Sequence, residues 1–364
     1  MSASPDPVEA ISQRLDIFVT AQRLHAAGLG AEAASFVEAA AATVEGGKRL
    51  RGRFCIAGWR AVEEASRPAP TLPAEVVTAA AALEVFHAAA LVHDDVIDNS
   101  DTRRGRPAAH RALEASHRDA RWEGDAAAFG RSAAVLLGDL LVAWSDDLFE
   151  EGLAVSLTAR ASAARAEYAT MRREVTIGQF LDIAEESAFV TEDDDRHADR
   201  ALRVASLKSA RYSIQQPLVI GAALAGADAA QVAALAAFGH PLGMAFQLRD
   251  DVLGVFGDER ETGKPSGDDL REGKRTVLIA YARESLAPPA RRIVDELVGD
   301  RTLDAAQIAS LQRTIVESGA LERVESLIAA YAREAERSLS GARLGNAAVG
   351  ELRDLARAAT VRVT

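Results

Sequence analysis

Two groups of acidic side chains, each at the end of an apolar run, are the residues best suited to chemistry. In the first group, Asp94, Asp95 and Asp98 follow the run AALEVFHAAALV. Asp94 and Asp98 are four residues apart and would share one face of a helix. The C-terminal end of a helix is the unfavourable pole for anions. A hard cation such as Mg²⁺, which prefers oxygen ligands, would account for carboxylates at that position.

The second group has the same organisation. The apolar run VAALAAFGHPLGMAF leads to Gln247, Asp250 and Asp251. Either group alone is compatible with an ordinary solvated helix end. Two such helices, about 150 residues apart, favour a shared site instead. If they run side by side, their acids face one another across a cleft, which suits several metal ions around a diphosphate.

A third set is cationic, and its members lie beside glycines or beside the acidic groups. Arginine offers phosphate a two-pronged donor and lysine a point charge, while glycine lets backbone approach closely. Each member alone could be a solvated surface charge. The set comprises Lys48, Arg49, Arg51, Arg103, Arg104, Lys208, Lys264 and Lys274.

With these motifs the sequence resembles the trans-type isoprenyl diphosphate synthases, or polyprenyl synthetases. The matching segments are GGKRLRG (46–52), ALEVFHAAALVHDDVIDNSDTRRGRP (82–107), LKSA (207–210) and GMAFQLRDDVLGVFGDERETGKPSGDDLREGKRT (243–276). They span most of the chain in the family's order. The resemblance implies an all-α fold, with residues 1–364 forming one large helical bundle around a deep central cavity. It also implies a homodimer.

The resemblance further implies a Mg²⁺-dependent reaction that joins isopentenyl diphosphate to an allylic diphosphate (dimethylallyl, geranyl or farnesyl). Asp94 and Asp98, with Asp95 beside them, would hold Mg²⁺ on the allylic diphosphate. Asp250, with Asp251 nearby, would hold a further Mg²⁺ from the opposite wall, for three ions per active site.

The same resemblance assigns the remaining side chains to substrate binding. Arg103, Lys208 and Lys264 would complete the allylic diphosphate pocket, and Lys48, Arg51, His87 and Arg104 would bind isopentenyl diphosphate. Gln247 and Ser209 would face the developing allylic cation, and Lys274 would help close the glycine-rich loop over the site.

Three positions depart from the family's pattern. Gly254 stands where a third aspartate is frequent, Gly52 where a proline is common, and Ser209 where a threonine is usual. We expect activity to survive these changes, because the first aspartate of the second motif is the usual direct ligand and Ser209 keeps a hydroxyl.

Product length should depend on side chains that precede Asp94. In this family the growing chain runs down the cavity from the first aspartate motif. Ala89 and Ala90 stand where short-chain synthases carry bulky aromatics, so the tunnel should stay open to geranylgeranyl diphosphate or longer. Phe86, one turn deeper, is the candidate floor, although it could equally be a core aromatic turned away from the tunnel.

The elements that must position these residues are predicted to be helices. Alanine and leucine dominate, aromatic residues make up only 5%, and alternating strand patterns are scarce. Residues 1–7 should fray. His110, His117 and His197 lie in polar segments and should face solvent.

Charge and composition narrow the class of protein. A formal net charge of −12 argues against nucleic-acid binding. The uncharged stretch Ala229–Leu248 contains Gln231 and His240 and is predicted to be a buried helix, not a membrane span. The N-terminus lacks a signal-peptide pattern, and the lone Cys55 fits a reducing compartment, so a cytoplasmic protein is expected.

Two alternatives remain open. A class I terpene cyclase shares the helical fold, but it would carry an Asn/Ser/Glu metal triad on the second helix and would not need an isopentenyl diphosphate site. A non-catalytic partner subunit of a prenyl synthase should have lost its metal-binding aspartates, which this chain keeps.

Overall fold

The computed structural model describes residues 6–258 and 265–360, and 79% of the protein is helical, which confirms the predicted all-α fold. The helices are α1 (Pro7–Ala27), α2 (Ala31–Val44), α3 (Leu50–Glu63), α4 (Ala74–Ile97), α5 (Ala109–Asp119), α6 (Ala126–Leu153), α7 (Thr158–Ala188), α8 (His197–Val204), η3 (Ala205–Gln215), α9 (Gln216–Ala225), α10 (Ala229–Phe256), α12 (Asp268–Glu272), α13 (Val277–Ser285), α14 (Pro288–Leu297), α15 (Ala305–Glu317), α16 (Ala320–Ser338) and α17 (Asn346–Thr360). Short 3-10 turns, η1 (Phe189–Thr191) and η2 (Asp194–Arg196), precede α8.

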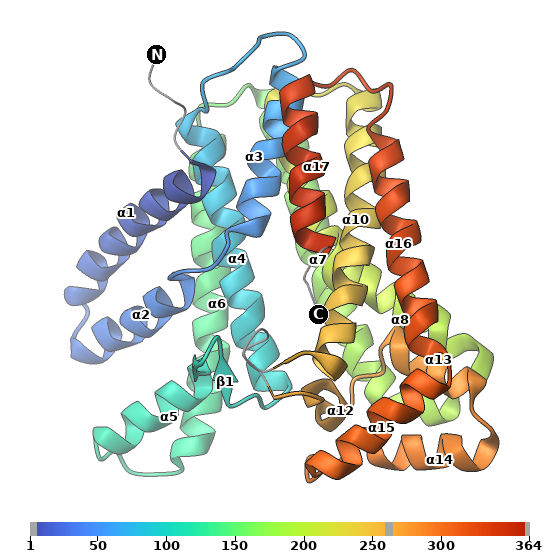
Figure 1. The fold of residues 1–364 in the computed structure, drawn as a ribbon. Helices are drawn as coiled ribbons and strands as arrows, with labels where there is room; N and C mark the ends of the chain where they lie inside the picture. The colour runs from blue at the N-terminus through green and yellow to red at the C-terminus, as the bar shows by residue number, and fades with distance from the viewer. Residues whose placement is uncertain (1–5, 259–264, 361–364) are drawn as a thin grey trace.

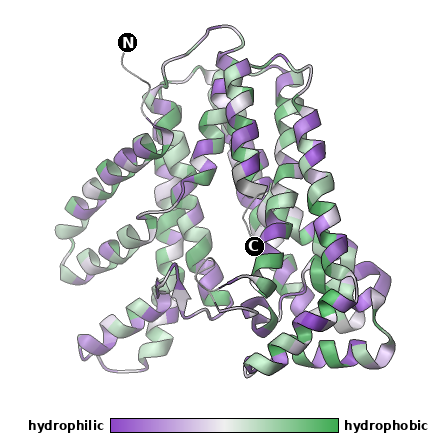
Figure 2. Cartoon of the chain, in the orientation of Figure 1, coloured by the Kyte–Doolittle hydropathy of each residue, from purple (hydrophilic) through white to green (hydrophobic). Residues whose placement is uncertain are grey.

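The long helices α4, α6, α7 and α10 run through the bundle, and α1 with α2 projects from one side as a hairpin (Figure 1). Most helices alternate hydrophobic and hydrophilic residues along their length, as amphipathic helices do (Figure 2). α1 begins at Pro7, where the Asp6 side chain accepts a hydrogen bond from Val8 N. The first helix therefore starts inside the stretch that was expected to fray, and residues 1–5 lie outside the described part.

A two-stranded hairpin follows α4. β1 (Thr102–Arg103) pairs antiparallel with β2 (Arg106–Pro107). The turn between them places Arg104 and Gly105 at φ 53° and 71°, a left-handed conformation that glycine adopts readily. Arg103 lies on the strand before this turn, and the chain turns back toward α4 earlier, where Ser100 N donates to Asp95 O.

Glycines allow α3 to pack very closely against α9. A Cβ built on Gly58 would lie 2.1 Å from Leu218 O, and one built on Gly221 would lie 1.8 Å from Cys55 O. Any side chain at either glycine would collide with backbone. Nearer its N-terminal end, α3 places Arg51 over the ring of Tyr212 in η3.

Pro241 lies inside a helix, whereas Pro217 lies in the first turn of one, where a missing N–H costs little. Pro241 lies inside α10 and cannot donate to the carbonyl of Ala237, which instead accepts from Ser338 Oγ at 2.9 Å. Pro217 follows η3, where the backbone winds as a π-helix through Lys208 and Tyr212. Such π-helical segments are frequent at functional sites.

Two buried clusters share α10. The larger involves α1–α4, α6, α7 and α9, and the smaller involves α12–α16. α4, α6 and α10 are each long and apolar enough to cross a membrane, judged by length and composition. Within the fold, 72% of the apolar window of α4 is buried, 50% of that of α10 and 33% of that of α6. Of these three helices, α6 therefore leaves the largest part of its apolar window exposed.

The prediction for three histidines was wrong. His110, His117 and His197 are 2%, 4% and 6% exposed, not solvent-facing. His117 packs against Trp122 and Phe129, with ring centroids 5.8 and 4.9 Å away. The segments are polar overall, but each histidine occurs on the inner face of a short amphipathic helix.

Candidate active site

The C-terminal ends of α4 and α10 lie at the same end of the bundle (Figure 1). Lys274 lies near both helix ends. Its Nζ is 3.8 Å from Asp98 Oδ2 and 3.6 Å from Oδ1 of Asp269, an α12 residue whose carboxylate lies against Gly254 of α10. Burial alone would lower the pKa of Lys274, but Asp269, Glu272 and Asp98 raise it well above its usual value. Lys274 is therefore a permanent cation between the two aspartate motifs.

Asp94 is held by side chains from three other elements. Its carboxylate lies 3.3 Å from Lys208 Nζ and 3.6 Å from Arg103 Nη2, and it accepts a 3.0 Å hydrogen bond from Gln179 Nε2. Burial raises the pKa of Asp94, but Lys208, Lys274 and Arg103 outweigh it and lower that pKa. Asp94 is therefore ionised at neutral pH.

Asp98 is one helical turn further along α4. Burial and the charge of Asp94 raise its pKa to about 6, so the two carboxylates disfavour each other's ionisation. A bound cation relieves such repulsion, and carboxylate oxygens are the ligands that Mg²⁺ prefers. The donors at this end of the bundle therefore fit Mg²⁺. Within residues 6–258 and 265–360, no three His, Cys, Asp or Glu side chains form a metal-binding group by themselves.

Asp95 has a different environment from Asp94 and Asp98. It is 3% exposed and accepts a 2.9 Å hydrogen bond from Arg103 Nε. Asp95 thereby orients the Arg103 guanidinium, which also reaches Asp94. The structure brings Asp95 into the site through Arg103.

On α10, Asp251 is buried and Asp250 is partly exposed. Gln247 Nε2 donates a 2.6 Å hydrogen bond to Asp251 Oδ1. Burial raises the pKa of Asp251 to about 8, with Asp269 and Asp250 adding to the shift and Gln247 opposing it. Gln247 therefore contacts the second aspartate of the motif.

Gly254 leaves a space that another acid fills. A Cβ built on Gly254 would lie 1.9 Å from Asp269 Oδ2, so the Asp269 carboxylate rests directly on this turn of α10. Asp269 belongs to α12. Gly273 N and Lys274 N donate to its backbone carbonyl at the end of this short helix, and its carboxylate lies 3.6 Å from Lys274 Nζ.

The residues assigned to isopentenyl diphosphate cluster around Tyr212. The Arg51 guanidinium lies 4.3 Å from the Tyr212 ring centroid, and His87 Nδ1 lies 3.0 Å from Tyr212 Oη. A Cβ built on Gly47 would lie 3.2 Å from Arg104 Nη1, which places Arg104 against this glycine turn. Lys48 is exposed at the same turn.

The protonation states in this cluster follow from burial and charge. Burial and the charges of Arg51, Arg104 and Arg103 lower the pKa of His87 well below 6.5. Burial raises the pKa of Tyr212 to about 12. Tyr212 therefore stays protonated and His87 neutral, and the two share a hydrogen bond whose donor depends on the tautomer of His87.

Lys208 and Ser209 lie in η3. Lys208 Nζ forms ion pairs with Asp94 and with Asp182, and these two acids raise its pKa against the effect of burial. Ser209 is partly buried beside it. Lys264 lies outside the described residues.

Three polar residues of α7 were missed by the sequence analysis. Gln179 and Asp182 contact Asp94 and Lys208, and Glu186 follows on the same helix face. Burial, Asp182 and Asp98 raise the pKa of Glu186 to about 7. Their spacing of three and four residues was the available signal, but a solvated helix face has the same spacing.

Phe86 lies two turns before Asp94 on α4 and is 6% exposed. Its ring meets Tyr168 and Tyr212 edge-on, at centroid distances of 6.3 and 6.0 Å. Ala89 is 1% exposed, whereas Ala90, which shares a face with Phe86 and Asp94, is only partly buried.

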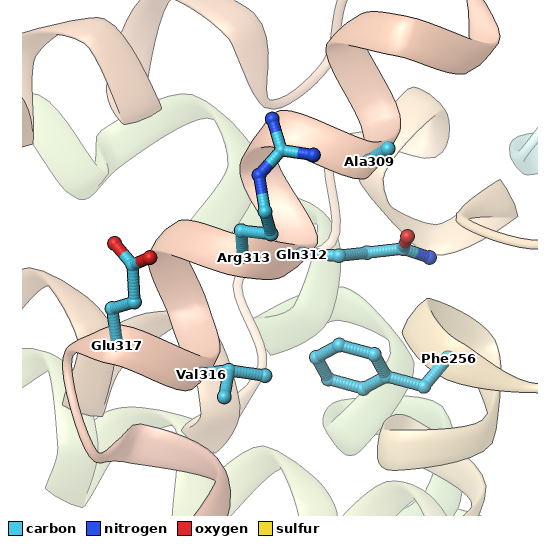
Figure 3. A pocket seen from close by; sticks show the side chains of 6 residues that line it. All are labelled: Phe256, Ala309, Gln312, Arg313, Val316 and Glu317. Atoms are coloured by element: carbon cyan, nitrogen blue, oxygen red, sulfur yellow. The ribbon is translucent and has the colours of Figure 1, made fainter.

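A separate pocket of about 340 Å³ lies between the end of α10 and α15. Phe256 and Val316 face each other there, beside Gln312 (Figure 3). Gln312 Nε2 already donates to Val255 O at 2.7 Å. The pocket contains none of the predicted site residues.

The all-helical fold and the paired acidic helix ends define a class of protein, and the chain belongs to the polyprenyl synthetase family, whose model matches residues 34–315. A geranylgeranyl pyrophosphate synthase from Corynebacterium glutamicum, solved with isoprenyl diphosphate and magnesium, is similar with a TM-score of 0.90 and 39% identity over 98% of each chain.

Curated relatives differ in product. Heptaprenyl diphosphate synthase component 2 of Geobacillus stearothermophilus is 35% identical over 277 residues, 76% of each chain. Geranylfarnesyl diphosphate synthase of Aeropyrum pernix is 32% identical over 301 residues, covering 81% of this chain and 83% of that protein. The chain is thus a chain-elongating prenyltransferase of this family, while product length varies among its relatives.

Proposed function

We propose that this enzyme condenses isopentenyl diphosphate with an allylic diphosphate in a Mg²⁺-dependent elongation, and that its product is geranylgeranyl diphosphate or longer. The observation that carries the proposal is the set of cations Lys274, Lys208 and Arg103 beside Asp98 and Asp94, at the end of the bundle where α10 also ends (Figure 1). The carboxylates of such a pocket suit metal ions, and its lysine and arginine side chains suit the diphosphate to which those ions are bound.

Asp94 and Asp98 would hold Mg²⁺ from α4, and Asp250 would hold it from α10, with three ions in the substrate-bound site. When bound, these ions neutralise the diphosphate and stabilise the charge that develops as it leaves. Lys208 and Arg103 bind the same leaving group from the protein side. Both are already oriented by Asp182 and Asp95, so little reorganisation is needed during the reaction.

The second substrate binds at the Arg51, His87 and Arg104 cluster, with Lys48 at its rim. Cleavage of the allylic C–O bond leaves a carbocation, and the isopentenyl double bond attacks it to form the new C–C bond. Gln247 and Ser209 present polar atoms toward the cation. Loss of one proton then restores a double bond, and the released diphosphate accepts that proton. Apolar walls exclude water, which would otherwise quench the cation.

Product length is set, in this proposal, by the α4 face that carries Asp94, Ala90 and Phe86. The methyl groups of Ala89 and Ala90 leave room for the growing chain. Phe86 forms the floor, supported by the edge-on contacts with Tyr168 and Tyr212.

We also propose a homodimer in which a second copy covers α6 and α7. Val135 and Leu136 of α6 are 43% and 61% exposed, and Ile177 and Phe180 of α7 are 54% and 65% exposed. A surface with several large apolar side chains is typical of an interface. Lipid is a poor alternative cover for α6, because the Asp139 side chain beside Leu136 is 66% exposed.

The chain would work as a single domain in the cytoplasm, on small diphosphates and not on nucleic acid. α10 contributes to both buried clusters, which supports one domain. Cys55 is a buried free thiol, as expected in a reducing compartment.

Turnover by the purified protein alone tests the function. With Mg²⁺, isopentenyl diphosphate and farnesyl diphosphate, mass analysis should find elongated diphosphates. A cyclic hydrocarbon made without isopentenyl diphosphate would identify a terpene cyclase. No product from the correctly folded chain would identify a non-catalytic partner subunit.

The aspartate assignment has a matched control. Asp94→Ala and Asp250→Ala should each lower turnover by about 10²–10⁴-fold, because roughly 3–5 kcal/mol of leaving-group stabilisation is lost. Asp147→Ala removes an exposed acid of α6 and should leave turnover unchanged. Near-normal turnover in either site variant would refute the two-wall metal site.

A further inference from the structure

Gly52 and Glu84 form a buried hydrogen bond between α3 and α4. Gly52 N donates to Glu84 Oε1 at 2.8 Å, and the two residues are 32 positions apart. Glu84 is 7% exposed. A buried carboxylate needs a partner, and here the partner is a backbone N–H in the first turn of a helix.

The start of α3 lacks an ordinary cap. Its N-cap residue is Arg49, at φ 50° and ψ 43°, and no side chain caps it by a local hydrogen bond. Arg49 instead donates from Nη1 to Val44 O at 2.8 Å. Glu84 therefore supplies from α4 the negative charge that a helix N-terminus favours.

The position of this bond relates it to substrate binding. Lys48 and Arg51 flank the N-terminus of α3, and His87 is three residues after Glu84 on the same face of α4. Arg51 and His87 meet at Tyr212. One hydrogen bond thus joins the two backbone segments that carry these side chains.

Gly52 also makes this chain's arrangement distinct from the usual motif. A proline at position 52 has no N–H and could not donate to Glu84. In addition, a Cβ built on Gly52 would lie 2.6 Å from Ile11 Cδ1 and 3.1 Å from Ala80 O. The glycine both donates the bond and allows α3 to approach α4.

We propose that Glu84 is a positioning residue for isopentenyl diphosphate: through Gly52 it fixes the first turn of α3, and so the placement of Lys48 and Arg51 relative to His87. This inference rests on the proposed function, since it deepens the assignment of one of its two substrate pockets. Glu84 touches no substrate in this proposal.

Steady-state kinetics with each substrate varied in turn test the proposal. Glu84→Ala should raise the KM for isopentenyl diphosphate at least about tenfold and leave the KM for the allylic substrate within about twofold, as expected for one buried hydrogen bond to a charged acceptor. Glu84→Gln keeps an acceptor and should stay within about threefold of the wild type. Equal increases in both KM values, or a Gln variant no better than Ala, would overturn the proposal.

A second pair of variants decides the question if Glu84→Ala does not fold. Gly52→Ala keeps the N–H and adds a Cβ against Ile11, whereas Gly52→Pro adds comparable bulk and removes the donor. The proline variant should show a KM for isopentenyl diphosphate about tenfold above that of the alanine variant. Identical values would show that the N–H has no role.

Amide hydrogen exchange separates this inference from the proposed function. The Gly52 amide should exchange slowly in the wild type and much faster in Glu84→Ala. If the wild-type protein made no product, the proposed function would fail, while a protected Gly52 amide would still support the hydrogen bond between Gly52 and Glu84. A Gly52 amide that exchanges equally fast in both proteins would refute the role of the hydrogen bond to Glu84, whatever the enzymatic activity.

Discussion

Replacing Phe86 by alanine should lengthen the product by about one isoprene unit. A helical turn rises about 5.4 Å, which is close to the length of one such unit. The space that opens is bounded by Tyr168, whose ring stacks on Phe149 at a centroid distance of 4.0 Å and whose hydroxyl bonds to Ser145. Because Tyr168 is held on both sides, it should stop the chain one step deeper.

The substitution has a stability cost that the assay must allow for. Truncating a buried phenylalanine costs about 3–5 kcal/mol, a large part of the about 5–15 kcal/mol that stabilises an ordinary domain. Circular dichroism should therefore confirm folding at the assay temperature. Products made from farnesyl and isopentenyl diphosphates would be dephosphorylated and measured by mass spectrometry.

Substitutions nearer the aspartates provide the opposite test. Ala90→Phe places a ring on the face between Asp94 and Phe86 and should shorten the main product. Ala89→Phe should also shorten it, at a greater stability cost, because Ala89 is fully packed. Unchanged products in all three single variants would mean that the tunnel follows another helix face. Very long products from Phe86→Ala alone would mean that Tyr168 is no barrier.

Further outcomes follow from the two pockets and from the surface. Lys48→Ala should chiefly raise the KM for isopentenyl diphosphate and Lys208→Ala that for the allylic substrate; equal effects of either on both substrates would contradict separate pockets. The lowered pKa of His87 means that acid protonates the unfolded chain first, so stability present above pH 6.5 is lost below it. Urea unfolding at pH 7.5 and at pH 5.5 should show this loss in the wild type and not in His87→Gln; an equal loss in both proteins would contradict the burial of His87. Leu136→Glu should shift the protein from dimer to monomer in sedimentation equilibrium, and a monomeric wild type would refute the interface.

The sequence predicted the helical fold and both aspartate motifs because their information is local. Spacing within one helix is rigid, so Asp94 and Asp98 had to share a face once α4 was recognised. Apolar runs that end in acids also identified which helix ends should meet. Both helix ends lie at the same end of the bundle (Figure 1).

Contacts made across the bundle were not available from the sequence. Asp95 and Arg103 meet because the chain turns back directly after α4, where Ser100 N donates to Asp95 O, and nothing in the spacing required it. Gln179 and Asp182 belong to a long helix that carries many other polar residues with the same spacing. Only the packing of α7 beside η3 distinguishes them, since it brings Lys208 within reach of Asp182.

Departures from a family motif illustrate the same limit most clearly. Gly254 and Gly52 read in the sequence as lost groups, a missing carboxylate and a missing proline. In the structure each glycine is in use: Asp269 occupies the space above Gly254, and Glu84 accepts the N–H of Gly52. An aspartate introduced at position 254 would meet the Asp269 carboxylate, and two acids in one space repel and resist ionisation. Restoring the family's aspartate at position 254 would therefore disturb this site, because the Asp269 carboxylate already occupies the space.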